Sequence, residues 1–216
     1  MELYQRRYVM TSRTMTGRLL VIAPIGMIVS WFGWSALAGN PDSSDHAAMI
    51  IAVSQNPEST KWLLGLAGLF SLFMATGLSG FRNSMPGGQG SDYVSMGVLI
   101  TTMAITAGLG EIALTIAAGE VGATGNTSAA TTIYVAGNGI GVISTAAIFT
   151  GFLAIGLGLY IEKNFNQIIV GLLLIASLFG LGMTLYDYGN QLLAIGYMGM
   201  SLSVVALGVS MLRSSD

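Results

Sequence analysis

Six long apolar segments constrain this chain more than any other feature of its sequence. A helix needs about 18 or more apolar residues to cross the roughly 30 Å of hydrocarbon in a bilayer. The segments cover residues 17–38, 62–81, 94–117, 132–160, 168–186 and 191–212. Because helices satisfy their own backbone hydrogen bonds in lipid, we expect an all-α fold: a polytopic membrane bundle of six transmembrane helices, forming a single domain over residues 1–216.

The composition agrees with this class and excludes others. Hydrophobic residues make up 53% of the chain and charged residues only 8%, whereas soluble domains carry about 25% charged residues. Eight Lys and Arg residues against ten Asp and Glu residues provide no basic surface for nucleic acid. The expected surroundings are the lipid bilayer, together with partner subunits in the membrane or further copies of the chain.

The sequence also lacks the residues that most intramembrane chemistry requires. There is no Cys and a single His, His46, so the chain alone builds no thiolate site and no multi-histidine metal site. The two lysines, Lys61 and Lys163, lie at segment ends, where no buried Schiff base can form. We expect no metal, no cofactor and no catalytic residues.

The distribution of basic residues orients the expected helices. With six alternating spans, seven of the eight basic residues fall on one side, and only Lys61 falls on the other. The positive-inside rule then places both termini in the cytoplasm of a cell whose plasma (inner) membrane holds the protein. The basic residues on the cytoplasmic side are Arg6, Arg7, Arg13, Arg18, Arg82, Lys163 and Arg213.

Two outer segments between the apolar runs have recognisable patterns. Residues 42–58 favour a short helix that Ser43 or Ser44 caps and Pro57 ends, acting as a lid over helix ends or as a substrate gate. Residues 119–130 are rich in Gly, Thr and Asn and predict a loop that separates two runs of three helices.

A repeated motif is compatible with two inverted halves of three helices each. Gly65-Leu66 and Ser71-Leu72-Phe73 recur at identical offsets as Gly171-Leu172 and Ser177-Leu178-Phe179. The match pairs the second segment with the fifth, as a 3+3 inverted repeat requires. The alternative is chance similarity between sequences built from few residue types.

Glu111 is the acidic residue that lies clearly inside an apolar segment. It is six residues from the outer end of the third segment, about 9 Å deep at about 1.5 Å per residue. Ala104, Gly108 and Thr115 share its face, whereas the opposite stripe of Ile105, Leu109, Ile112 and Ile116 suits lipid. We therefore expect Glu111 to point into the bundle, where an ionisable group is a candidate for function.

Asn138 is the expected hydrogen-bond partner of Glu111. It enters the fourth segment at a similar depth, and antiparallel neighbouring helices would bring the two side chains together. One interpretation is a purely structural bond between helices. The other is a protonatable site that faces an outward cavity, with Tyr134 and Asn190 at its rim.

The aromatic residues near the outer ends have a simpler interpretation. Trp31, Trp34 and Trp62, like Tyr186 and Tyr188, fall near the expected membrane interface, where amphipathic rings anchor helices. The alternative is an aromatic box for a substrate.

The chain resembles a family of small six-helix prokaryotic membrane proteins that is known only as a domain of unknown function. The residues that carry the resemblance are Arg18, Ser59-Thr60, Leu63-Leu64-Gly65, Met96-Gly97 and Tyr160. It implies a topology and no activity.

Two functions follow as hypotheses. The first is a non-catalytic accessory or assembly subunit of a membrane complex, because the chain has no catalytic constellation and has Gly-rich helices with ample packing surface. The alternative is a small proton-coupled transporter or channel that uses Glu111 as its intramembrane carboxylate.

Overall fold

A computed structural model of the chain describes residues 2–41, 45–85 and 87–213, with side chains from residue 13 onward. It contains seven helices in this part of the chain, six of which are long and apolar enough to cross a membrane. The expected all-α membrane bundle is confirmed. The helices are α1 (Glu2–Leu37), α2 (His46–Gln55), α3 (Pro57–Asn83), α4 (Gln89–Ala123), α5 (Thr127–Glu162), α6 (Gln167–Tyr186) and α7 (Leu193–Arg213).

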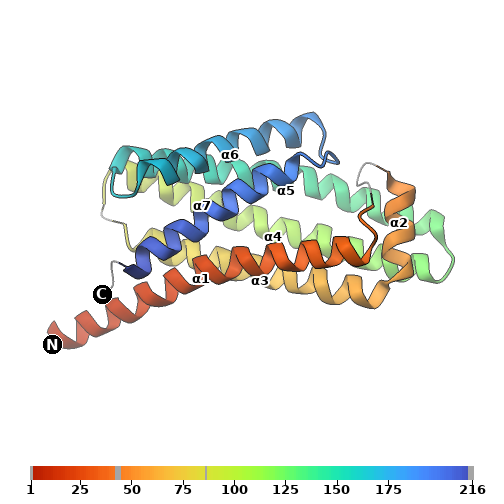
Figure 1. Cartoon of the computed structure of the whole chain (residues 1–216), viewed down its shortest axis with the longest axis horizontal. Coiled ribbons are helices and arrows are strands. Elements are labelled where there is room, and N and C mark those ends of the chain that lie inside the picture. The colour runs from red at the N-terminus through yellow and green to blue at the C-terminus, as the bar shows by residue number, and fades with distance from the viewer. Residues whose placement is uncertain (1, 42–44, 86, 214–216) are drawn as a thin grey trace.

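The six long helices form a closed ring in chain order. Each packs against its predecessor and its successor, and α7 returns to α1 to complete the ring. Figure 1 shows both termini at one end of the bundle and α2 lying across the opposite end. We call these the terminal end and the α2 end; the latter comprises α2 and the loops 124–126 and 187–192.

Several helices extend beyond the expected boundaries. The loop expected over residues 119–130 is wrong, because α4 continues to Ala123 and α5 begins at Thr127. The turn needs only three residues because Gly125 takes a positive φ of 87° and Asn126 caps α5 by accepting a hydrogen bond from the Ala129 amide at 3.2 Å. The long α5 is one continuous helix, without the extramembrane turn that its length could accommodate.

The short helix α2 forms where residues 42–58 predict one. Its cap is Asp45, whose Oδ1 accepts from the Ala47 and Ala48 amides at 3.0 Å; Ser43 and Ser44 lie outside the described residues. Pro57 is the first residue of α3, where its missing N–H costs nothing. The buried face of α2 carries Met49, Ile50, Ala52 and Val53.

Small residues hold α4 and α5 together over their whole length. Gly90 of α4 lies opposite Gly158 of α5, and Gly97 lies opposite Gly151; a Cβ at Gly97 would stand 2.5 Å from the Gly151 carbonyl oxygen. In lipid there is no hydrophobic force between helices, so close backbone packing takes its place. The spacing of seven continues with the buried residues Ala104 and Ala118 on α4 and Ser144 and Ala130 on α5.

A hydrogen bond between the same helices closes this interface at the terminal end. The first residues of α4 lack a side-chain cap of their own, because Gly88 precedes them. Glu162 at the end of α5 supplies it: its Oε1 accepts from the amides of Gly90 at 3.0 Å and Ser91 at 3.3 Å. A carboxylate at a helix N-terminus is also favoured by the helix dipole.

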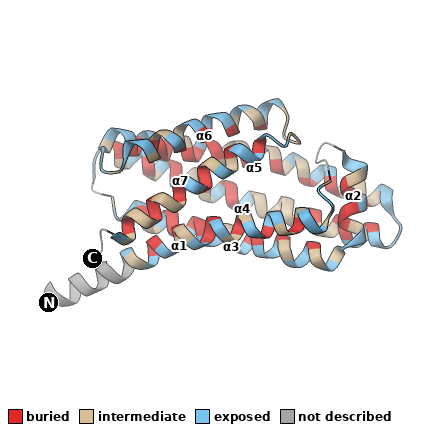
Figure 2. Cartoon of the chain, viewed as in Figure 1, coloured by how far each residue is buried: buried red, intermediate tan, exposed pale blue. Residues whose placement is uncertain are grey.

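The other helix contacts use glycine in the same way. Gly26 of α1 seats the ring of Phe70 on α3, and Gly180 of α6 seats Phe149 of α5. Gly17 of α1 meets Gly208 of α7, which brings the first and last helices together and closes the ring. Buried residues line the inner side of every long helix and exposed residues the outer side, as Figure 2 shows.

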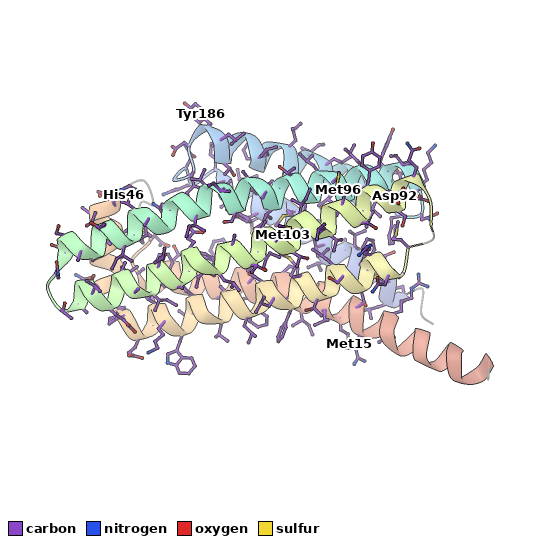
Figure 3. The ribbon with its side chains drawn as sticks, turned by 180° about the vertical axis from the view of Figure 1, so that it is seen from behind. Met15, His46, Asp92, Met96, Met103 and Tyr186 are labelled. Atoms are coloured by element: carbon purple, nitrogen blue, oxygen red, sulfur yellow. The ribbon has the colours of Figure 1, made fainter. Side chains whose placement is uncertain are left out.

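Two expectations about helix faces are wrong. The stripe of isoleucines and Leu109 on α4 faces α3 and not lipid, since Ile105 is 3% exposed and Gly68 of α3 packs on Leu109. The outward face of α4 instead carries Met96, Leu99 and Met103 (Figure 3). Hydrophobicity alone could not separate the two faces, because both are apolar.

Trp34 also differs from its expected interfacial place. Trp31 and Trp62 are exposed, as membrane anchors should be, but Trp34 is buried and its Nε1 donates to Thr60 Oγ1 at 3.1 Å. This bond fastens α1 to α3 near the α2 end.

The inverted repeat stays a prediction. A ring of six helices in chain order has the neighbour pattern that two inverted halves would produce. The equivalent residues Gly65 and Gly171 both lie where a Cβ would meet no atom within 4 Å.

We expect Gly151→Ala to destabilise the bundle by about 1–3 kcal/mol, because the added methyl group would press on the backbone of Gly97 and Thr101. Gly139→Ala on the same helix is the matched control, since a Cβ there meets nothing within 4 Å. Thermal unfolding in detergent, followed by circular dichroism, measures both. Equal unfolding temperatures for the two variants would contradict the proposed role of this interface.

Candidate functional site

The candidate site begins with Glu111, which interrupts the small-residue spacing of α4. Counting by sevens from Gly97 and Ala104, position 111 should carry a small residue, and it carries a carboxylate instead. Gly141 of α5 provides the room, because a Cβ there would collide with the Glu111 carboxyl group. The half-buried carboxyl group therefore lies between the two most closely packed helices, pointing into the bundle as expected.

Tyr188 donates a hydrogen bond to this carboxyl group. Its hydroxyl lies 2.7 Å from Glu111 Oε1 and stands over Gly141. Burial raises the pKa of Tyr188 above its ordinary value, and the negative charge of Glu111 raises it further. Tyr188 thus keeps its proton and acts as a donor at any physiological pH.

The loop between α6 and α7 presents Tyr188 to the bundle. Asp187 shapes this loop: its Oδ1 accepts from the Gly189 amide at 3.1 Å, and its Oδ2 accepts from Asn190 Nδ2 at 3.4 Å. Tyr186, two residues earlier, projects away from the bundle (Figure 3) and is 82% exposed. The turn at Asp187 therefore sends two neighbouring tyrosines to opposite environments.

Two further hydroxyl groups extend the cluster inward. Thr145 of α5 and Tyr197 of α7 share a hydrogen bond of 2.7 Å, and Thr145 also interacts with the Tyr188 hydroxyl. The chain of polar groups runs from Glu111 through Tyr188 and Thr145 to Tyr197 and joins α4, α5, α7 and the 187–192 loop. We call these four residues the Glu111 cluster.

A second polar group links α5 to the short helix α2. Asn138 Nδ2 lies 3.4 Å from His46 Nε2, and the His46 ring meets the Tyr134 ring edge-on with centroids 5.7 Å apart. Tyr134 is buried, interacts with Asn138 and feels the charge of Glu111. Through these contacts His46 of α2, labelled in Figure 3, packs against α5.

The structure brings together some of the residues expected at the site and gives others different partners. Glu111, Tyr134 and Asn138 do lie together in the half of the bundle nearest α2, but the expected hydrogen bond between Glu111 and Asn138 is wrong. Among the described residues, Tyr188 is the donor to Glu111, and Asn138 turns to His46. Asn190 holds its own loop, where its Oδ1 accepts from the Leu192 amide at 3.0 Å.

Sequence reasoning missed Tyr188, Thr145, Tyr197 and His46. Tyr188 resembled an interfacial anchor because it adjoins Tyr186, and nothing in the local sequence distinguishes the two. Thr145 carried a usable signal, because it follows Gly141 by one helical turn and so shares its face. Tyr197 carried another, as a hydroxyl in the interior of an apolar segment.

The chemistry available to the cluster is that of one carboxyl group surrounded by hydroxyl groups. In the part of the chain that the structure describes, no three His, Asp or Glu residues converge as metal ligands. The ion pair found there joins the exposed residues Lys61 and Glu120 at 3.7 Å, away from Glu111. Glu111 therefore has no basic partner among these residues, and its options are to bind a proton or another positive charge.

Comparison of the chain with protein-family models, curated proteins and solved structures finds no match. This outcome is consistent with an uncharacterised family and assigns no activity.

We expect Tyr188→Phe to lower the free energy of unfolding by about 1–2 kcal/mol, because it removes the donor to the Glu111 carboxyl group. Tyr186→Phe is a matched control on an exposed side chain two residues away. The measurement is thermal unfolding of both variants in the same detergent. A Tyr186→Phe effect as large as that of Tyr188→Phe would show that the bond contributes nothing specific.

Proposed function

We propose that this protein is a small proton-coupled membrane transporter, without catalytic activity, whose proton-binding group is Glu111. The observation that carries the proposal is the hydrogen bond from Tyr188 to a carboxyl group that has no basic partner in the described residues. The proposal concerns the half of the bundle nearest α2, where the Glu111 cluster lies.

The cost of Glu111 supports a functional role. Alanine at this position would continue the spacing of small residues and would close the α4–α5 interface without a polar group. A carboxyl group within a membrane span is costly whether it is charged or not. Proton exchange therefore explains a carboxyl group at this position better than helix packing does, because a small residue would pack equally well without that cost.

The arrangement around Glu111 suits reversible proton binding. The Tyr188 hydroxyl stabilises the charged carboxylate by donating to it, and the Glu111 side chain is half-buried rather than fully enclosed. The polar group of His46, Asn138 and Tyr134 lies between α2 and α5, and Tyr134 feels the charge of Glu111.

We further propose that the α2 end faces outward and that both termini are cytoplasmic in the plasma membrane. Seven of the eight basic residues belong to the terminal end of the bundle, whereas Lys61 lies near the α2 end together with the acidic residues Asp45, Glu58, Glu120 and Asp187.

The other function expected from the sequence, an accessory or assembly subunit of a membrane complex, stays a hypothesis. Its partners would be membrane subunits or further copies of the chain, packed on outward faces such as that of Met96 and Met103. Lipid covers such faces equally well, so no contact favours this function over transport.

The first test of the transport proposal is Glu111→Gln, which keeps the size of the side chain and removes its proton exchange. Infrared difference spectra of the purified protein, recorded during a pH titration, should show a protonated carboxyl band that the variant lacks. In reconstituted vesicles with an entrapped pH dye, we expect Glu111→Gln to abolish proton movement coupled to transport.

The control is Glu120→Gln, which removes an exposed acid from the same helix and should leave both signals in place. Retention of the titrating band in Glu111→Gln, with the variant folded and monodisperse, would refute the assignment.

A separate prediction concerns orientation. Since the chain has no cysteine, single cysteines can be introduced at Asn164 and Thr124 without background labelling. We expect an impermeant thiol reagent to label Thr124→Cys in intact cells and Asn164→Cys only after the membrane is opened. The reverse pattern would invert the proposed topology.

A further inference from the structure

We propose that Thr145 is a positioning residue: it joins Tyr188 and Tyr197 into a one-directional chain of hydroxyl donors that ends on Glu111. The bond that Tyr197 of α7 makes then depends on whether Glu111 carries a proton. This inference rests on the proposed function and deepens it, because it names the residue and the helix through which proton binding would act on the bundle.

The direction of the chain follows from counting protons. A hydroxyl group has one proton to donate, and its oxygen can also accept. The Tyr188 hydroxyl donates to Glu111 Oε1 at 2.7 Å, so its oxygen can only accept from Thr145, with which it also interacts. Thr145 thereby uses its one proton. Across the 2.7 Å bond between Thr145 Oγ1 and the Tyr197 hydroxyl, Tyr197 must therefore be the donor.

Thr145 differs from other threonines of the same helix in where its hydroxyl group bonds. Thr150 donates to the carbonyl four residues before it, that of Ala146, at 2.8 Å, as threonines in helices commonly do. The corresponding carbonyl for Thr145 is that of Gly141, which accepts from Ser144 at 3.1 Å. Thr145 is 2% exposed and bonds across helices instead. Its hydroxyl group therefore links other elements rather than its own backbone.

Glu111 is the group whose charge can change at the end of this chain. The titratable groups that face it from packed elements are Tyr134 of α5, Tyr188 of the loop and Tyr197 of α7, and phenols keep their protons at physiological pH. Residues 62–81 of α3 include no titratable side chain. His46 of α2 contacts Tyr134, outside the chain of hydroxyl groups.

The charge of Glu111 sets the strength of every bond in the chain. A hydrogen bond to a charged acceptor is about twice as strong as one between neutral groups. Hydrogen bonds in a chain also polarise one another, so each strengthens the next. When Glu111 binds a proton, the bonds that Tyr188, Thr145 and Tyr197 donate should weaken together.

The far end of the chain lies where α7 meets α5. The Tyr197 hydroxyl bonds to Thr145, and the Tyr197 ring packs on Phe149 with centroids 5.0 Å apart. The other neighbours of α7 in the ring are α6 and α1. Proton binding on α4 would therefore loosen the polar contact between α7 and the closely packed α4–α5 pair.

The test is infrared difference spectroscopy of the purified full-length protein with isotopically labelled tyrosine, recorded during a pH titration. The C–O stretching band of a tyrosine reports the hydrogen bond of its hydroxyl group. We expect a band that Tyr197→Phe removes, and that shifts over the pH range in which the protonated carboxyl band of Glu111 appears. Glu111→Gln should abolish this shift.

Thr145→Val tests the positioning role, because it keeps the shape of the side chain and removes its hydroxyl group. We expect it to keep the carboxyl band and to lose the shift of the Tyr197 band. Thr145→Ser, which restores the hydroxyl group, should restore the shift. A merely structural role of Thr145 would not make a band of Tyr197 respond to the titration of Glu111.

Thr150→Val and His46→Gln are the controls. The first removes an exposed hydroxyl group of the same helix that bonds to its own backbone, and the second removes the titratable group of α2. Both should keep the shift of the Tyr197 band. Circular dichroism and gel filtration check the folding of each variant.

Three results would overturn the inference: no shift of the Tyr197 band in the unaltered protein, a shift that survives in folded Thr145→Val, or a shift that survives in folded Glu111→Gln. The first of these needs no variant at position 145 to fold. A carboxyl band that depends on Glu111, without a response of Tyr197, would refute the chain and leave the proton site intact. Absence of both signals would refute the two proposals together.

Discussion

Close approach of helix backbones is the constraint on which this structure depends. Within a bilayer, lipid tails are as apolar as leucine side chains, so helices gain stability from tight packing rather than from leaving water. The chain meets this constraint with glycine, most clearly where Gly90 and Gly97 face Gly158 and Gly151. The same close packing determines the surroundings of Glu111. Its carboxyl group lies between these two helices, against Gly141, and accepts a hydrogen bond from Tyr188.

The architecture could be predicted because the length and mean hydropathy of each apolar segment depend on many residues together and not on any single one. Six apolar segments form six helices, and the short stretch that ends before Pro57 forms α2. Boundaries were less predictable where local composition misled. Gly119 and Gly122 suggested a loop, yet both lie in α4, where the backbone of Val53 and the side chain of Ser54 from α2 pack onto them. A glycine in a membrane helix marks a close neighbour as often as a turn.

The site could be predicted only in part, for a different reason. Small residues around Glu111 correctly indicated its direction, because they mark the packed side of a helix. The identity of its partner depended on a loop of six residues. The path of this loop is set by hydrogen bonds that Asp187 accepts from Gly189 and Asn190, and no sequence periodicity reveals them. Trp34 shows the same limit: its ring is buried because Thr60 of another helix accepts its N–H.

The contact between α1 and α7 has a consequence for how the protein is made. Apart from the contacts of Tyr197 on α7 with Thr145 and Phe149 on α5, the other contacts between long helices join neighbours in the chain. Each new helix can therefore pack on the one before it. The pairing of Gly17 with Gly208 must wait until α7 has been made. Until then the face of α1 that packs on α7 lacks its partner, so the ring of helices closes only when its last member joins its first.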